Sequence, residues 1–387
     1  MALYSDNDLN FNSRFFVCYF LSILLLISMP LLGIVMTGEP VDKFLEFPPL
    51  TRYVSHAPEN NFVFLLGLIT SLVFGVPLIL RFLKYLGTYP PGPAKGTFPV
   101  WGLAGIAILL SSWGISWDII KVPYSIRMWA FSPLWIGFIV CLNAISKWRL
   151  GTCVLERRPI SFLLLFGISC VFWWYFEFLN RFVQNWYYVG VSHIGAWRYS
   201  LMASFSFSTV LPAVLSVNEL LKCSCAFERA FDRPFWHFQP DRPFAIVMLI
   251  FSGTCLLSIG LWPDYLFPFL WISPLLIVCS MQIMCGLKNL AELAGQGRLG
   301  AIARLAASGL LCGFFWEMWN FWSYPKWIYS IPYVGQFKIF EMPLLGYWGY
   351  LPFGLECAAI STMVLPLEDI VNTPCLAPSC PRLKQAT

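Results

Sequence analysis

The chain has 387 residues, of which 58% are hydrophobic, 18% aromatic and only 12% charged, with a formal net charge of +5. Soluble domains carry about 25% charged residues, so the composition excludes an ordinary soluble protein, and it also excludes a disordered or collagen-like chain. The sequence therefore predicts an all-α polytopic membrane protein, with membrane lipids as its first expected partners.

Ten segments are apolar, poor in charge and about as long as a membrane-spanning helix. A helix needs about 20 apolar residues to cross the hydrocarbon layer. The predicted spans are residues 15–36, 62–80, 98–116, 128–146, 160–179, 199–221, 244–262, 265–285, 301–320 and 343–366. The first is too long for the core of a signal peptide and lacks a small-residue cleavage site behind it, so we expect it to remain as an anchor.

The distribution of positive charge predicts the orientation of these spans. Of the 25 Lys and Arg residues, seventeen fall on the side that holds both ends of the chain and eight on the other side. Because cytoplasmic loops are enriched in Lys and Arg, we expect a multi-pass protein of the plasma (inner) membrane with both termini in the cytoplasm. This bias accounts for the net charge, and no basic stretch with interleaved aromatic residues indicates a nucleic-acid partner.

An internal repeat is the most specific feature of the sequence. The motif Phe-Ser-Pro-Leu-Trp-Ile at 131–136 returns as Phe-Pro-Phe-Leu-Trp-Ile at 267–272. The motif Phe-Glu-Phe-Leu-Asn at 176–180 returns as Trp-Glu-Met-Trp-Asn at 316–320. The order of matching motifs holds over about 110 residues at an offset of roughly 136 to 146, which makes chance a poor explanation.

Further matches extend the repeat on its C-terminal side. A Trp and a Tyr-Val-Gly follow each Glu/Asn motif, and the alignment pairs Trp186 with Trp327 and Tyr188 with Tyr333. Each copy holds four predicted spans, an even number, so both copies run in the same direction and a pseudo-two-fold axis is expected along the membrane normal. The predicted parts are a two-span segment (1–97), repeat A (98–222), a cytoplasmic linker (223–243), repeat B (244–366) and a cytoplasmic tail (367–387).

The repeated Glu/Asn motifs are the first candidates for a binding or catalytic site. Glu177 and Asn180 are three residues apart, on one face of a helix near its extracytoplasmic end, and Glu317 and Asn320 repeat this spacing. A carboxylate in the membrane normally faces the bundle interior and has a partner. The flanking indoles complete the candidate ligand-binding set: Trp173, Trp174, Trp316 and Trp319.

Two such sites related by an axis could converge on one outward-facing cavity. A carboxylate and an amide among indole rings could hold a sugar or a cationic head group, or could place an acid beside a hydrophobic substrate. A structural role fits the same residues, because Trp and Tyr belts mark membrane interfaces and Glu or Asn at a helix end can bond the backbone of the following loop. Asp118 and Asp264 end their spans on the outer side, where we expect them to be solvated, although both could rim the same cavity.

Glu356 is a separate candidate because it lies near the middle of its predicted span, with no Lys or Arg within a helical turn. An intramembrane acid of this kind is a functional hypothesis by default. We expect it to be protonated, or to pair across the bundle with Asn143 or Asn218. Its counterpart in repeat A, Glu219, lies close to the cytoplasmic end and is expected to be solvated.

The sequence lacks the motifs of several chemistries. There is no Walker A loop, dinucleotide fingerprint, zinc-protease helix, nucleophile elbow or Asp-rich diphosphate cluster. The three histidines, His56, His193 and His237, fall outside the predicted spans, so neither a metal nor any cofactor is expected. The sequence predicts a protein that binds a hydrophobic or lipid-linked small molecule, as a transporter or a membrane-embedded enzyme. The alternative is a non-catalytic scaffold or a subunit of a membrane complex with unidentified protein partners.

Overall fold

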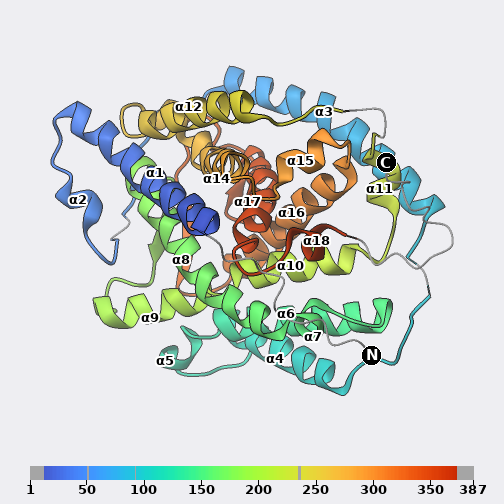
Figure 1. Ribbon diagram of the computed structural model, residues 1–387. Helices are drawn as coiled ribbons and strands as arrows, with labels where there is room; N and C mark the ends of the chain where they lie inside the picture. Colours follow the sequence, from blue (N-terminus) through green and yellow to red (C-terminus); the bar gives the residue numbers. More distant parts are fainter. Residues whose placement is uncertain (1–12, 50–51, 92, 234–236, 373–387) are drawn as a thin grey trace.

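The structure is a computed structural model that describes residues 13–49, 52–91, 93–233 and 237–372. Most of these residues are helical, and the helices form one bundle (Figure 1). Most of the expected cytoplasmic tail, residues 373–387, lies outside the described residues, as do residues 1–12 and part of the expected linker, 234–236.

Six helices are long and apolar enough to cross a membrane: α1 (Ser13–Thr37), α3 (Asn61–Thr88), α6 (Phe131–Leu150), α8 (Pro159–Val183), α16 (Leu299–Phe321) and the α9–α10 pair, which together cover Ala196–Leu221. Within this last span, α9 covers Ala196–Phe207 and α10 covers Val210–Leu221. The several long apolar helices make this a multi-pass membrane protein.

The other four predicted segments are helical, but each is short or broken. Both α4 (Val100–Ser116) and α12 (Arg242–Ser258) have 17 residues, a length of roughly 25 Å. The segment at 265–285 becomes α13 (Pro263–Leu266), the 3-10 helix η2 (Phe267–Leu270) and α14 (Ser273–Met284), with a bend of 49°. Proline explains this break, because Pro268 and Pro274 cannot donate a backbone hydrogen bond inside a continuous helix.

The last predicted span is helical only in its second half. It starts with strand β4 (Met342–Pro343) and the 3-10 helix η3 (Leu344–Gly349), and α17 (Tyr350–Ser361) follows. The glycines at positions 346 and 349 and the proline at 343 explain why a regular helix does not begin earlier. The remaining helices have four to six residues each: α2 (Asp42–Leu45), α5 (Tyr124–Arg127), α7 (Val154–Arg157), α11 (Ala226–Phe231), α15 (Leu290–Gly295) and α18 (Leu367–Val371).

Four short strands depart from the all-α expectation. β1 (Trp186–Val189) pairs with β2 (Lys326–Tyr329), and β3 (Lys338–Ile339) pairs with β4, both in antiparallel register. The β1–β2 pair joins the two long aromatic loops that follow α8 and α16. Each strand therefore lies just beyond the C-terminal end of a helix that carries a Glu/Asn motif.

Two pairs of helices are arranged alike at opposite edges of the bundle. α4 packs against α6, and α12 packs against α14. In Figure 1, α4 lies along one edge and α12 lies with α3 along the opposite edge, while α10 and α17 lie between them and contact each other. α16 contacts both of these central helices.

The two N-terminal spans attach to the bundle in different ways. α1 packs against α12 and α14 and approaches α12 so closely that a Cβ on Gly33 would lie 2.1 Å from the Leu257 carbonyl oxygen. Small residues allow this close helix contact in membranes. α3 is held loosely by comparison, because Phe64 is the only buried residue among its 28. It contacts the bundle mainly through η3 and α11.

The end of the bundle away from β1 and β2 is held by buried charges. Glu219 is 2% exposed and accepts from Arg157 over 2.6 Å and from Lys222 over 2.9 Å. The expectation that Glu219 is solvated is therefore wrong. Arg304 is fully buried, donates to Asn218 and to the Val371 carbonyl, and pairs with Glu228, so these charges link α10, α11 and α16 to the α18 end of the described chain.

Candidate functional site

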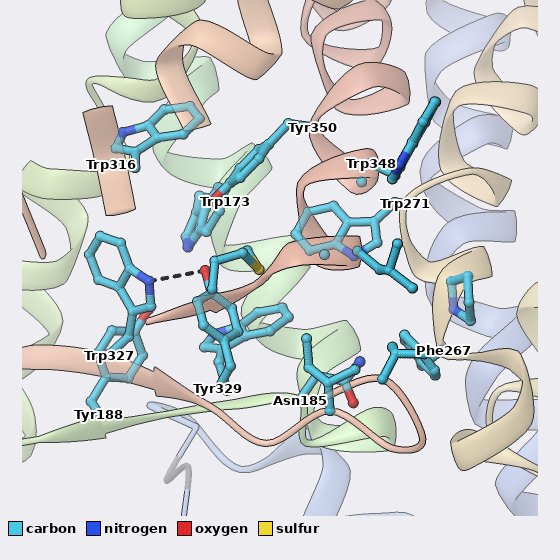
Figure 2. Close-up of a pocket in the computed structure, with 18 of the residues that line it drawn as sticks. Trp173, Asn185, Tyr188, Phe267, Trp271, Trp316, Trp327, Tyr329, Trp348 and Tyr350 are labelled. Atoms are coloured by element: carbon cyan, nitrogen blue, oxygen red, sulfur yellow. Dashed lines mark hydrogen bonds between the residues drawn. The ribbon is translucent and has the colours of Figure 1, made fainter. Parts of the chain in front are cut away.

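A large cavity lies next to the β1–β2 strand pair, and we call it the aromatic cavity (Figure 2). Its volume is about 1150 Å³, which is slightly above the ~300–1,000 Å³ typical of small-molecule pockets. α3, α8, α9, η2, α16, both strands, η3 and α17 contribute to its wall. The aromatic lining residues include Trp173, Trp186, Tyr188, Tyr199, Trp271, Trp316, Trp327, Tyr329, Trp348 and Tyr350.

Glu177 lies behind this wall and binds three of its side chains. Glu177 is fully buried, and its Oε1 accepts from the Tyr188 hydroxyl over 2.6 Å. The same oxygen accepts from the indole nitrogens of Trp173 and Trp186, each over 3.1 Å. Oε2 is buried without a hydrogen-bond partner among the described residues. Glu177 thus fixes the orientation of wall residues and does not itself line the cavity.

Glu317 repeats this arrangement from α16. It is also fully buried, and its Oε1 accepts from the hydroxyls of Tyr329 and Tyr350, each over 2.7 Å. The Trp327 indole donates to the same oxygen over a longer distance of 3.4 Å and to the Tyr329 hydroxyl over 3.0 Å. Figure 2 shows Trp327, Tyr329 and Tyr350 around the hollow, so the side chains that bind both glutamates line one cavity.

Asn180 and Asn320 fasten the strands to the helices that precede them. The Asn180 amide donates to the Trp186 carbonyl over 2.8 Å and accepts from the backbone N–H groups of Asn185 and Trp186. The Asn320 amide donates to the Trp327 carbonyl over 2.8 Å and accepts from its N–H over 3.0 Å. These amides bond the backbone of the following loop, as the structural interpretation of the motif expects.

The strand register relates the two motifs to each other. Trp186 lies opposite Tyr329, and Tyr188 lies opposite Trp327. Trp186 and Tyr188 both donate to Glu177, and Trp327 and Tyr329 both donate to Glu317. Tyr188 therefore corresponds to Tyr329 in position and bonding, and the sequence alignment of Tyr188 with Tyr333 was wrong.

The four candidate tryptophans divide into two groups. Trp173 and Trp316 line the aromatic cavity, and their rings lie 6.3 Å apart between centroids, so they join α8 to α16. Trp174 instead donates to Ser204 over 2.9 Å, and Trp319 is buried among Trp113, Trp135 and Phe315. Neither of these two lines the cavity.

Glu356 lies in the interior of α17, away from the aromatic cavity. It is 1% exposed, and its Oε2 has no hydrogen-bond partner among the described residues. The expected partners are engaged elsewhere: Asn143 bonds Ser216 and the Leu155 N–H, and Asn218 bonds Arg304 and the Ile370 carbonyl. The proposed pairing with Asn143 or Asn218 is therefore wrong.

Several wall residues were not among the candidates chosen from the sequence. Trp271 and Tyr350 line the cavity, and Trp271 lies in the 267–272 motif that resembles 131–136. Asn185 also lines the cavity; it is 5% exposed, and its Oδ1 has no partner among the described residues. Asp264 lines the cavity and binds His56, whereas Asp118 forms an exposed ion pair with Lys121.

The chemistry of the wall suits an apolar ligand with few hydrogen-bonding groups, because the Trp186, Trp327, Tyr188, Tyr329 and Tyr350 donors are already directed at buried carboxyl groups. Within the described ranges, no three His, Cys, Asp or Glu side chains are grouped so that they could hold a metal ion. In comparisons with known proteins, no family model, curated protein or solved structure matches this chain.

Proposed function

We propose that this chain is a ten-span inner-membrane protein that binds a hydrophobic or lipid-linked small molecule in the aromatic cavity. In this proposal α1 and α3 lead two parallel four-helix repeats, related by a pseudo-two-fold axis along the membrane normal. Both termini lie in the cytoplasm, and the cavity opens toward the opposite side.

The β1–β2 register supports the repeat. In this register each tryptophan lies opposite a tyrosine: Trp186 faces Tyr329, and Trp327 faces Tyr188. A two-fold rotation that exchanges the two tryptophans and the two tyrosines converts one of these pairs into the other. Contacts across the bundle agree with this exchange. The ring of Trp135 lies 5.1 Å from that of Trp316, and the ring of its counterpart Trp271 lies 5.0 Å from that of Phe176.

The observation that carries the binding proposal is a lipid-sized aromatic cavity whose wall includes the loosely held helix α3. Val63 and Gly67 of α3 and Trp348 of η3 line the cavity, and Val63 and Trp348 are 39% and 41% exposed. Most other residues of α3 are exposed and apolar, as expected of a helix surrounded by lipid. An apolar molecule therefore has a route from the bilayer into the cavity beside α3.

The positions of Glu177 and Glu317 favour a binding function for the cavity over a catalytic role for these two residues. Glu177 and Glu317 lie behind the wall, so they orient Tyr and Trp side chains and do not contact a bound molecule. Glu356 is a buried acid without a polar partner among the described residues, which fits a proton-coupled transporter. A scaffold without a ligand has no need of so large a cavity.

The test is native mass spectrometry of the purified full chain, with lipidomics of what co-purifies. We expect a bound apolar molecule that is lost when Trp271→Ala and Trp316→Ala remove cavity wall, but retained in Trp262→Ala, which changes an exposed indole outside the cavity. If nothing co-purifies with well-folded protein, the binding proposal fails.

Substitutions of the acids separate the three modes of action. A transporter predicts uptake or efflux that depends on the proton gradient and is lost in Glu356→Gln. An enzyme predicts a lipid product that disappears in Glu177→Gln or Glu317→Gln while the protein still folds. A scaffold predicts that these variants alter only stability or the recovery of partner proteins.

A further inference from the structure

A second hollow adjoins the aromatic cavity, and we call it the basic pocket. Its volume is about 490 Å³, and it lies between the C-terminal ends of α1 and α8 and the segment that links α2 to α3. Trp186 and Asp264 line both hollows. The two hollows therefore adjoin at these two residues.

Positive side chains dominate the basic pocket. Lys43, Arg52 and Arg181 line it, against the carboxylates of Glu46 and Asp264. Lys43 also pairs with Glu39 at the exposed rim, over 2.6 Å. Among the described residues, Arg52 forms no ion pair, so its charge is available to a ligand.

His56 and the backbone of Ala57 hold Asp264. The His56 Nδ1 lies 2.7 Å from Asp264 Oδ1, and its Nε2 lies 3.1 Å from the Gln184 carbonyl oxygen. The His56 side chain is 8% exposed, and the Ala57 N–H donates to Asp264 Oδ2 over 3.0 Å. Both oxygens of this carboxylate therefore already have a hydrogen-bond partner within the pocket.

Arg181 shapes the pocket from the end of α8. Its guanidinium donates to the Glu46 carbonyl over 2.8 Å and also to the Lys43 carbonyl, and it lies 3.6 Å from the Glu46 carboxylate. These contacts hold the α2 segment, with its Lys43, against α8. Arg52 is the basic side chain of this pocket that has no ion-pair partner among the described residues. Lys43 forms its ion pair with the exposed Glu39, so a ligand can replace that partner.

We propose that the basic pocket binds the phosphate group of an amphiphile whose apolar part occupies the aromatic cavity. This inference rests on the proposed function and names its ligand class: a phosphate ester carried on hydrocarbon chains. Lys and Arg donors match phosphate oxygens, and the shared Trp186–Asp264 edge places the charged and apolar ends of such a molecule in adjoining hollows.

The experiment compares two ligands that differ only in phosphate. The full chain is purified in dodecyl maltoside, a detergent without a phosphate group, and binding of dioleoyl phosphatidic acid and of dioleoylglycerol is measured by native mass spectrometry. We expect phosphatidic acid to bind about tenfold more tightly, a difference of about 1.4 kcal/mol, because its phosphate accepts charge-assisted hydrogen bonds from Lys and Arg. Inorganic phosphate alone, added as a third ligand, should bind far more weakly than the lipid.

Matched variants test whether Lys43 and Arg52 cause the preference for phosphatidic acid. Lys43→Gln with Arg52→Gln should abolish the preference for phosphatidic acid, Arg52→Lys should keep most of it, and Lys121→Gln should leave it unchanged because that exposed lysine lines neither hollow. Equal binding of the two lipids by the wild type would overturn the phosphate assignment and leave the cavity proposal intact. Tight binding of inorganic phosphate would overturn the amphiphile assignment, and binding of neither lipid would overturn the proposed function itself.

Discussion

Tyr188 and Tyr329 occupy matched positions between the aromatic cavity and a buried glutamate. Each donates its hydroxyl to the Oε1 of that glutamate, over 2.6 Å and 2.7 Å. Each tyrosine therefore lines the cavity and also donates a structural hydrogen bond to a buried carboxyl group.

We expect Tyr188→Phe and Tyr329→Phe each to lower the free energy of unfolding by about 1–3 kcal/mol, because each removes one donor from a buried carboxyl group. Thermal unfolding of the purified protein in detergent checks this. Tyr53→Phe is the control, since Tyr53 is 64% exposed and should tolerate the change. Equal unfolding midpoints for Tyr329→Phe and Tyr53→Phe would contradict the assigned role.

We expect the carboxyl group of Asp232, which follows α11, to make the stability of the fold depend on pH. Burial raises the pKa of this carboxyl from its ordinary value of 3.8 to about 6, and its Oδ1 accepts from the Gly300 N–H over 2.8 Å. The folded state therefore holds a proton between about pH 4 and pH 6 that the unfolded state has lost, so this group costs stability as the pH rises through that window.

Asp232→Asn should raise the unfolding temperature at pH 7.5 and leave it nearly unchanged near pH 4, because the amide keeps the acceptor for Gly300 without the buried charge. Unfolding curves of wild type and variant at the two pH values provide the measurement. A difference between the proteins that is the same at both pH values would contradict this assignment.

At the scale of elements, the contact between α3 and η3 lies at the proposed entrance to the aromatic cavity. Gly67 faces Leu345, and a Cβ at this position would lie 2.7 Å from Leu345 Cδ1. Both residues line the cavity. A large side chain at position 67 must therefore enter the cavity or displace α3.

Gly67→Trp should reduce the bound apolar molecule to a small fraction of the wild-type amount. Leu66→Trp is the matched control, because Leu66 is the neighbouring residue, is 57% exposed and lies outside the cavity wall. Quantitative lipid analysis of both purified variants tests this. Equal lipid content in the two would place the entry route elsewhere.

The elements also show what the sequence could predict. Hydropathy placed a helix in each of the ten segments, but six helices among the described residues have the length of a full span. Prolines and glycines break the segments at 265–285 and 343–366, and α4 and α12 have only 17 residues each. The strands β1 and β2 were not predicted. Their aromatic residues fit a strand as well as an interfacial loop, and the pairing joins positions about 140 residues apart.

The candidate site, like the fold, could be predicted only in part from the sequence. Glu177, Glu317 and their neighbouring tryptophans stood out because few acids occur in the spans, and the repeat placed them in matched positions. The contact between His56 and Asp264 joins residues 208 positions apart, so no local pattern could reveal it. Sequence spacing also could not show that the glutamates lie behind the cavity wall and not on it.

At the scale of the whole molecule, the two ends of the bundle differ in what holds them together. Buried ion pairs around Glu219, Lys222 and Arg304 hold one end. At the other end, carboxyl groups bind aromatic donors around a large cavity. Removing one partner of a buried ion pair commonly costs about 3–5 kcal/mol, so the charged end is well suited to act as a rigid base. The aromatic end is then the part that can admit a ligand.

The central claim is that the aromatic cavity holds an apolar molecule taken from the bilayer. An electron cryomicroscopy map of the full chain in a lipid nanodisc tests it most directly. The account predicts elongated density between Trp271, Trp316 and Tyr350 that continues past Trp186 toward Arg52. A map in which well-ordered side chains enclose only water, or in which the cavity is closed, would contradict it.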